Sequence, residues 1–215
     1  MEYRKPADIE RRSMEIIGEE LSQRGIALPE DIAPVMKRVI HTTADFDYLD
    51  TLTFTRDVVD LGVRALLDGT PIVTDTNMAL AGISKPGLRK LGSRVICYMA
   101  DEDVAEEAKS RETTRAAVSV EKAAREAPGC IYAVGNAPTA LLELIRQMER
   151  GFRPALIIGV PVGFVNVVEA KEAVLSVCRE LNVPAIVALG RKGGSTVAAA
   201  ICNALIYRAA DQKEP

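Results

Sequence analysis

Apolar residues in this chain alternate between short continuous runs and longer segments with helical spacing. Three continuous runs are typical of strands buried on both faces, and they cover residues 131–134, 155–158 and 185–189. A segment with helical periodicity follows each run, at about 138–150, 170–181 and 195–210. This alternation predicts an α/β fold with a mainly parallel sheet and helices on both faces.

The first half of the chain shows the same alternation less regularly. A helical face that includes Ile9 and Leu21 ends near Gly25, and a second helix at about 34–40 places His41 near its C-terminal end. We expect further strands at 49–54, 71–74 and 94–99. Further helices are expected after a Thr55 cap up to Gly69, at 78–83, from Asp101, and at 116–127. With no visible linker, the pattern predicts one domain over 1–215, with a short solvated tail from about 211.

Composition narrows the function classes. The chain has 215 residues, 48% hydrophobic, and 30 acidic against 27 basic residues, for a net charge of −3. An acidic chain without Trp is a poor candidate for nucleic-acid binding. Four widely spaced cysteines without a CxxC pair predict buried free thiols. The charged N-terminus argues against a secretory signal, and no apolar run reaches a membrane span, so we expect a cytoplasmic protein.

Glycine-rich turns follow three of the expected strands, at 135–139, 159–163 and 190–195. In a parallel sheet these turns meet at one edge, where ligands bind. Glycine allows close approach of the backbone, and the next helix N-terminus favours anions. Arg191 and Lys192 add positive charge to the third turn, although a tight turn with two solvated charges fits as well. Neither GxxxxGK[ST] nor GxGxxG occurs, which weakens a nucleotide interpretation.

His41 is the single histidine of the chain. A zinc site with several histidines in one chain is therefore excluded, and any imidazole chemistry must use this residue. Its ordinary pKa of about 6.5 suits it to donate or accept a proton. A histidine satisfied at a helix end is the alternative interpretation. No GxSxG motif supports a Ser-His-Asp triad.

Polar clusters interrupt the apolar pattern at three further places. Residues 74–77 follow a strand and should reach the same edge, although helix capping explains them too. Thr114 and Arg115 open a helix, where Arg115 could hold a carboxylate or lie exposed in the first turn. Arg12 and Ser13 lie on the first helix and could contact a ligand or form a solvated face.

These motifs together resemble the precorrin-8X methylmutase family of cobalamin biosynthesis. The resemblance covers nearly the whole chain and rests on Arg12-Ser13, Val39-Ile40-His41, Thr114-Arg115 and three loop motifs, GNAPTA, GVPVGF and GRxGGS. It implies a three-layer Rossmann-like domain, usually a homodimer. It also implies an isomerase that moves a methyl group from carbon 11 to carbon 12 of a tetrapyrrole substrate, a corrin precursor.

The resemblance implies no cofactor and no protein-bound metal. It places the proton or hydrogen-bond donor on His41. The substrate carries several acetate and propionate groups, and the residues expected to bind it are Arg12, Ser13, Thr42, Asn77, Arg115, Asn136, Arg191, Lys192, Gly193 and Ser195.

Two positions depart from the oxygen-dependent members of the family. Asn77 stands where those members have an acidic residue, and Lys192 where they have an apolar one. Both departures favour the cobalt-precorrin-8 branch, in which the substrate already carries cobalt. Two functions from other classes stay open: a tetrapyrrole carrier without turnover, and an enzyme that binds a phosphate ligand in the 190–195 loop.

Overall fold

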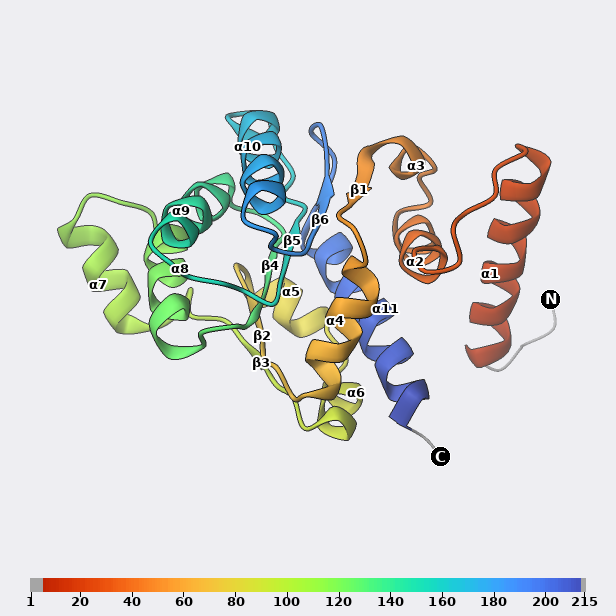
Figure 1. Cartoon of the computed structure of the whole chain (residues 1–215), viewed down its shortest axis with the longest axis horizontal. Coiled ribbons are helices and arrows are strands. Elements are labelled where there is room, and N and C mark those ends of the chain that lie inside the picture. Colours follow the sequence, from red (N-terminus) through yellow and green to blue (C-terminus); the bar gives the residue numbers. More distant parts are fainter. Residues whose placement is uncertain (1–5, 214–215) are drawn as a thin grey trace.

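A six-stranded sheet lies at the centre of residues 6–213, which are the residues described by the computed structural model. Its strands are β1 (Leu52–Phe54), β2 (Ile72–Thr74), β3 (Val95–Ile96), β4 (Ile131–Val134), β5 (Leu156–Gly159) and β6 (Ala185–Ala188). The order across the sheet is β1-β6-β5-β4-β2-β3. Neighbouring strands are parallel except β1, which runs antiparallel to β6 (Figure 1). The expected mainly parallel sheet is confirmed.

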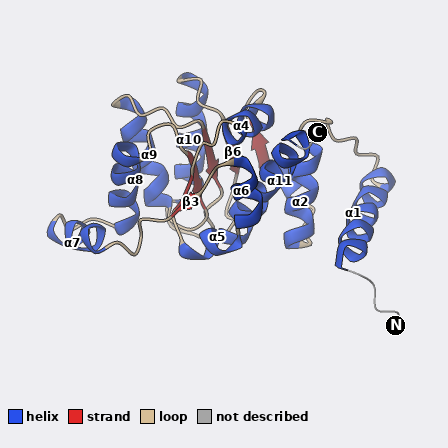
Figure 2. Cartoon of the chain, turned by 90° about the horizontal axis from the view of Figure 1, so that it is seen from below, coloured by secondary structure: helices blue, strands red, loops and turns tan. Residues whose placement is uncertain are grey.

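Helices cover both faces of the sheet, as expected (Figure 2). One face is covered by α4 (Val58–Leu67), α5 (Asn77–Gly82), α6 (Lys85–Leu91) and α11 (Ser195–Lys213). The other face is covered by α7 (Glu102–Ser110), α8 (Arg115–Glu126), α9 (Pro138–Glu149) and α10 (Val167–Glu180). Strand residues point alternately to the two faces, so Ile131 belongs to the first core and Tyr132 to the second.

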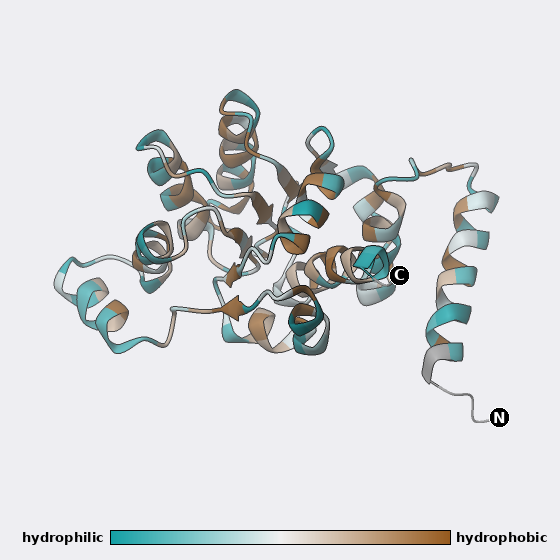
Figure 3. Ribbon diagram, turned by 60° about the horizontal axis from the view of Figure 1, so that its bottom comes forward, coloured by the Kyte–Doolittle hydropathy of each residue, from teal (hydrophilic) through white to brown (hydrophobic). Residues whose placement is uncertain are grey.

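Three helices extend the first face beyond β1. They are α1 (Pro6–Gln23), α2 (Ala33–Thr43) and α3 (Tyr48–Thr51). Helix α2 packs against α11, and α1 packs on α2 at the far end of the molecule (Figure 1). The strands and α11 are mainly apolar, whereas α1 and α7 carry many hydrophilic residues (Figure 3). Within residues 6–213, no helix combines the length and apolar character needed to cross a bilayer.

Several predicted boundaries were wrong. The expected strand at 49–54 begins as α3, and only residues 52–54 pair with β6. A turn starts there because the Asp45 carboxylate accepts a hydrogen bond from the Asp47 N–H, and the Thr51 hydroxyl donates to the Asp47 carbonyl. The expected strand at 94–99 is paired only at residues 95–96.

Helix termini also differ from the expected ones. Thr55 does not cap α4, because its hydroxyl accepts a hydrogen bond from the Ala185 N–H. The residue that precedes α4 is Asp57, whose backbone is in the left-handed conformation. Helix α6, which was not predicted, begins with a Ser84 cap and ends at Gly92. Helix α11 continues through Lys213, so the expected tail at 211–213 is its exposed last turn; residues 214–215 lie outside the described residues.

The strand order reverses its direction between β2 and β4. From β2 the chain moves outward to β3, and from β4 it moves the opposite way through β5 to β6. The loops after β2 and β4 therefore separate at the carboxyl edge of the sheet. Such a reversal is the usual place for a ligand crevice in an open α/β sheet.

Candidate active site

Asp75 joins the loop after β2 to the loop after β4. It follows β2 directly and is 1% exposed. Its carboxylate accepts the N–H groups of Gly135, Asn136 and Ala137, each at 2.8 Å. Burial raises the pKa of Asp75, and these three hydrogen bonds oppose the rise. We expected these amides to bind ligand carboxylates; that expectation was wrong, because the protein supplies its own carboxylate.

Glycines in the loops of the carboxyl edge allow the backbones of neighbouring loops to lie in close contact. A Cβ on Gly193 would lie 2.2 Å from the Val160 carbonyl oxygen, and one on Gly135 would lie 2.7 Å from the Ser195 Cα. The Gly194 N–H also donates to Val160 at 2.8 Å. The loops after β4, β5 and β6 therefore pack on one another at Gly135 and Gly193, which gives both glycines a structural reason. The expected contact of Gly193 with substrate stays a prediction.

The loop after β2 is joined to the start of α11. The hydroxyls of Thr76 and Ser195 lie 2.8 Å apart, and Thr76 also accepts the Ala79 N–H as the cap of α5. Asn77 begins α5 and is exposed, and Met78 beside it is 69% exposed. Asn77 and Ser195, both expected to bind substrate, therefore lie on adjacent segments of one edge.

Lys192 connects this edge to the segment after His41. Its ammonium lies 2.6 Å from carboxylate oxygens of both Asp45 and Asp47. The hydrogen bond from Lys192 is the main cause of a lowered pKa at Asp45. His41 and Thr42 are exposed in the last turn of α2. This helix ends at Thr43, three residues beyond the predicted end at residue 40. Lys192, expected to meet substrate directly, thus also holds the β6 loop against the α2–α3 loop.

Arg115 and Arg191 are exposed on the same edge. Arg115 opens α8 after Thr114, whose hydroxyl donates to the Thr139 hydroxyl at 3.0 Å, so the α8 and α9 N-termini are neighbours. The Arg191 guanidinium lies 5.4 Å from the centre of the Phe164 ring. Neither arginine has an ion-pair partner among residues 6–213. Asn136, in the Asp75-bound loop, is also exposed.

Arg12 and Ser13 lie on α1, the helix that packs against α2, which carries His41. Ser13 and His41 both line a groove of about 510 Å³ between α1 and α2. The Ser13 hydroxyl donates to the Ile9 carbonyl of its own helix, and the Arg12 guanidinium pairs with Glu15 and Glu19. Within one chain, Ser13 therefore shares a groove with His41, whereas Arg12 is engaged by its own helix.

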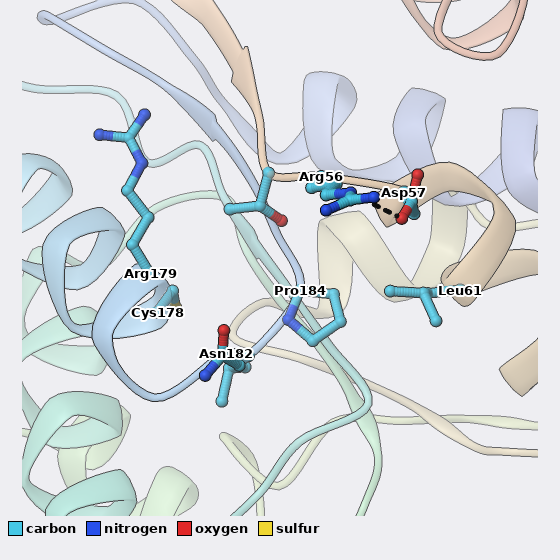
Figure 4. A pocket seen from close by; sticks show the side chains of 9 residues that line it. Arg56, Asp57, Leu61, Cys178, Arg179, Asn182 and Pro184 are labelled. Atoms are coloured by element: carbon cyan, nitrogen blue, oxygen red, sulfur yellow. Dashed lines mark ion pairs between the residues drawn. The ribbon is translucent and has the colours of Figure 1, made fainter.

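A separate hollow of about 310 Å³ lies at the opposite, amino edge of the sheet (Figure 4). Arg56, Leu61, Arg179 and Pro184 are among the residues that line it, and it contains none of the expected site residues. The described residues contain no group of three or more His, Cys, Asp or Glu side chains arranged to hold a metal ion. The arrangement of charged and apolar side chains at the carboxyl edge is therefore the stronger candidate for an active site.

Two features of this edge were not predicted from the sequence. Residues 74–77 were interpreted as a capping cluster, and the binding of Asp75 to the next loop was not foreseen, because a contact across 60 residues leaves no local signal. Lys171, which is fully buried on α10 beneath the β6 loop, was also missed. A signal existed here: Lys171 shares the helical spacing of the apolar positions 167, 170, 174, 175 and 178.

Sequence comparisons relate the chain to one group of enzymes. A family model described as precorrin-8X methylmutase matches residues 8–208. The cobalt-precorrin-8 methylmutase of Priestia megaterium is 44% identical, over 94% of this chain and 87% of its own length. The enzyme of that name from Leptospira interrogans is 43% identical over 96% of both chains. The precorrin-8X methylmutase of Pseudomonas aeruginosa is 38% identical, over 92% of this chain and 93% of its own.

A solved structure agrees with these relatives. The precorrin-8X methyl mutase of Thermus thermophilus has a TM-score of 0.84 and 39% identity to this chain, and the match covers 95% of this chain and 98% of that one. The match therefore covers nearly the whole of both chains.

Proposed function

The chain belongs to the precorrin-8X methylmutase family, and from that premise we propose that it is an isomerase of corrin biosynthesis acting at the carboxyl edge described above. It moves a methyl group from carbon 11 to carbon 12 of its tetrapyrrole substrate, giving hydrogenobyrinic acid from precorrin-8 or cobyrinic acid from its cobalt form. The reaction rearranges bonds within one molecule, so product and substrate have the same mass.

We place the substrate site at the carboxyl edge because exposed cations and exposed apolar side chains gather there. Arg115 and Arg191 are free of acidic partners in the described chain, so their guanidinium groups are available to bind substrate carboxylates in bidentate pairs. Arg12 and Lys192 are already paired with acidic side chains, which makes them secondary candidates for the same role.

Exposed apolar residues at the same edge support a contact with the substrate ring. Phe164 is 81% exposed and Val165 is 78% exposed, and Val162 and Met78 are also exposed. Exposed apolar residues grouped in this way are typical of binding surfaces. We therefore place the corrin plane against the loop after β5, with its acidic side groups toward Arg191 and Arg115.

His41 is assigned the proton or hydrogen-bond donor. It is exposed at the end of α2 and lines the groove with Ser13 and Phe46. A protonated imidazole directed at the conjugated system beside the migrating methyl would stabilise the charge that develops in the rearrangement. Binding at the edge loops would hold the ring in a geometry suited to migration.

Helix α1, at the far end of the molecule, offers a surface for a homodimer. Ile9 and Ile16 on α1 are about half exposed, and the helix contacts its own chain mainly through α2. We propose that a second copy covers these residues, and that the protein works in the cytoplasm, where its four cysteines remain free thiols. Light scattering coupled to size-exclusion chromatography would detect the dimer; a monomer at micromolar concentration would contradict it.

The substrate form is tested by a parallel assay with metal-free precorrin-8 and cobalt-precorrin-8. We expect faster conversion of the cobalt form, because Asn77 and Lys192 depart from the oxygen-dependent members and because the relatives with 43–44% identity carry the cobalt name. Absorption spectra and mass spectrometry would show a changed chromophore at unchanged mass. Conversion of neither form would overturn the proposed function, and preference for the metal-free form would overturn the cobalt assignment.

A further inference from the structure

Lys171 is a buried charged residue that the proposed mechanism does not use. It lies in the second turn of α10, on the face that packs against the sheet, and it is 0% exposed. Its neighbours on that face include Val167, Ala170 and Val174, all buried. An apolar side chain would normally occupy such a position, because burying an ammonium group removes its hydration.

The side-chain hydrogen bonds of Lys171 within residues 6–213 go to the loop after β6. Its Nζ donates to the carbonyl oxygens of Gly190 and Lys192, both at 2.8 Å. Within residues 6–213, no carboxylate lies within ion-pair distance of it. Burial lowers the pKa of Lys171 to about 8. The buried ammonium group is thus compensated by two backbone carbonyls of the loop after β6 rather than by a carboxylate.

Other contacts complete the support of this loop. The carbonyl of Arg191, between the two residues that Lys171 holds, accepts the Gly163 N–H at 3.2 Å. The backbone carbonyls of residues 190, 191 and 192 therefore each accept a hydrogen bond from outside this loop. The side chain of Arg191 lies over the Phe164 ring, and that of Lys192 reaches Asp45 and Asp47.

We propose that Lys171 is a positioning residue for the substrate site: by holding the backbone at Gly190 and Lys192, it directs Arg191 toward the substrate and Lys192 toward the segment after His41. This inference rests on the proposed function, since it takes Arg191 as a carboxylate ligand. Without the ammonium group, two loop carbonyls lose their donor and the loop can rotate. A displacement of about 1 Å at a substrate contact can cost about 100-fold in rate.

The test is the Lys171→Met variant, which keeps the length and apolar stem of the side chain and removes the donor. We expect kcat/KM for cobalt-precorrin-8 to fall about 10- to 100-fold, mainly through a higher KM. The melting temperature should change little, because removal of a buried charge offsets the loss of two hydrogen bonds. The matched control is Lys122→Met, which removes a largely buried ammonium that pairs with Asp101 and Asp103 away from the edge. The control should keep the wild-type KM.

A merely structural role gives different results. If Lys171→Met has a wild-type KM, or only a lower kcat from a smaller folded fraction, the inference is overturned. If the methionine variant does not fold, Lys171→Gln retains one amide donor without the charge, and we expect an intermediate KM; a wild-type KM in that variant would also overturn the inference. Failure of the wild-type protein to convert substrate would overturn the proposed function instead.

Discussion

Replacement of Asp75 by Asn tests whether one carboxylate organises the junction of the β2 and β4 loops. In the wild-type protein, one carboxylate oxygen accepts the Gly135 N–H and the other accepts those of Asn136 and Ala137. Asparagine has a single acceptor oxygen. If that oxygen keeps the two N–H groups of Asn136 and Ala137, the amide NH2 of Asn faces the buried Gly135 N–H, so two donors oppose each other.

The expected loss in the free energy of unfolding can be worked out from these hydrogen bonds. One buried N–H without an acceptor costs about 1–3 kcal/mol, and the remaining two hydrogen bonds lose the extra strength that a charged acceptor gives. Relief of the buried charge, whose cost is visible in the raised pKa of Asp75, offsets part of this loss. We therefore expect the free energy of unfolding to fall by about 2–4 kcal/mol, which lowers the melting temperature of a chain of this size by about 5–15 °C.

Differential scanning calorimetry measures this change directly. The matched control is Asp68→Asn, an exposed aspartate at the end of α4 with no side-chain partner among the described residues, for which we expect a change within about 0.5 kcal/mol. The Asp75 variant should also bind product more weakly, because Asn136 is in the loop it holds. A melting temperature for the Asp75 variant equal to that of the control would refute the reasoning.

Three further predictions follow from the same edge. Gly193→Ala should destabilise the protein by about 3 kcal/mol or more, since its Cβ would lie 2.2 Å from the Val160 carbonyl oxygen, and near-wild-type urea unfolding would contradict this. Thr76→Ala removes a helix cap and should lower the melting temperature by about 2–4 °C; an unchanged value would show that the cap is dispensable. The double variant Asp45→Asn/Asp47→Asn should change stability by at most about 1 kcal/mol, because these ion pairs are partly exposed. Because Lys192 lowers the folded-state pKa of Asp45 below 3.8, wild-type stability from this pair should be present above about pH 4 and decline as the pH falls through the lowered pKa; parallel acid-unfolding curves for the two proteins would contradict the contribution.

Local patterns were sufficient for most of the sheet and its helices. The three continuous apolar runs became β4, β5 and β6, because strands buried on both faces need no polar positions. Local patterns failed where tertiary contacts decide the structure. Thr55 has the composition of a helix cap, yet its hydroxyl accepts the Ala185 N–H across the sheet.

The sequence predicted which loops meet at the carboxyl edge but not how they bind one another. Asn77, Arg115 and Arg191 were expected at the carboxyl edge, and the strand order brings their loops there. His41 was expected only near the end of a helix, and the Lys192 ion pairs with Asp45 and Asp47 bring the segment after it to that edge. The amides of the glycine-rich loop were expected to be free, but Asp75 uses them. Such pairing depends on residues distant in the chain, and no spacing within one loop reveals it.

The His41→Ala variant tests the central claim most directly, with conversion and product binding measured on the same preparation. We predict that turnover of the preferred substrate falls about 100- to 10,000-fold, the usual contribution of one proton donor, while the Kd for product stays within a few-fold of the wild-type value. That result would separate the chemistry at His41 from the carboxylate contacts at Arg115 and Arg191. Wild-type turnover by the variant would show that His41 is not the proton or hydrogen-bond donor.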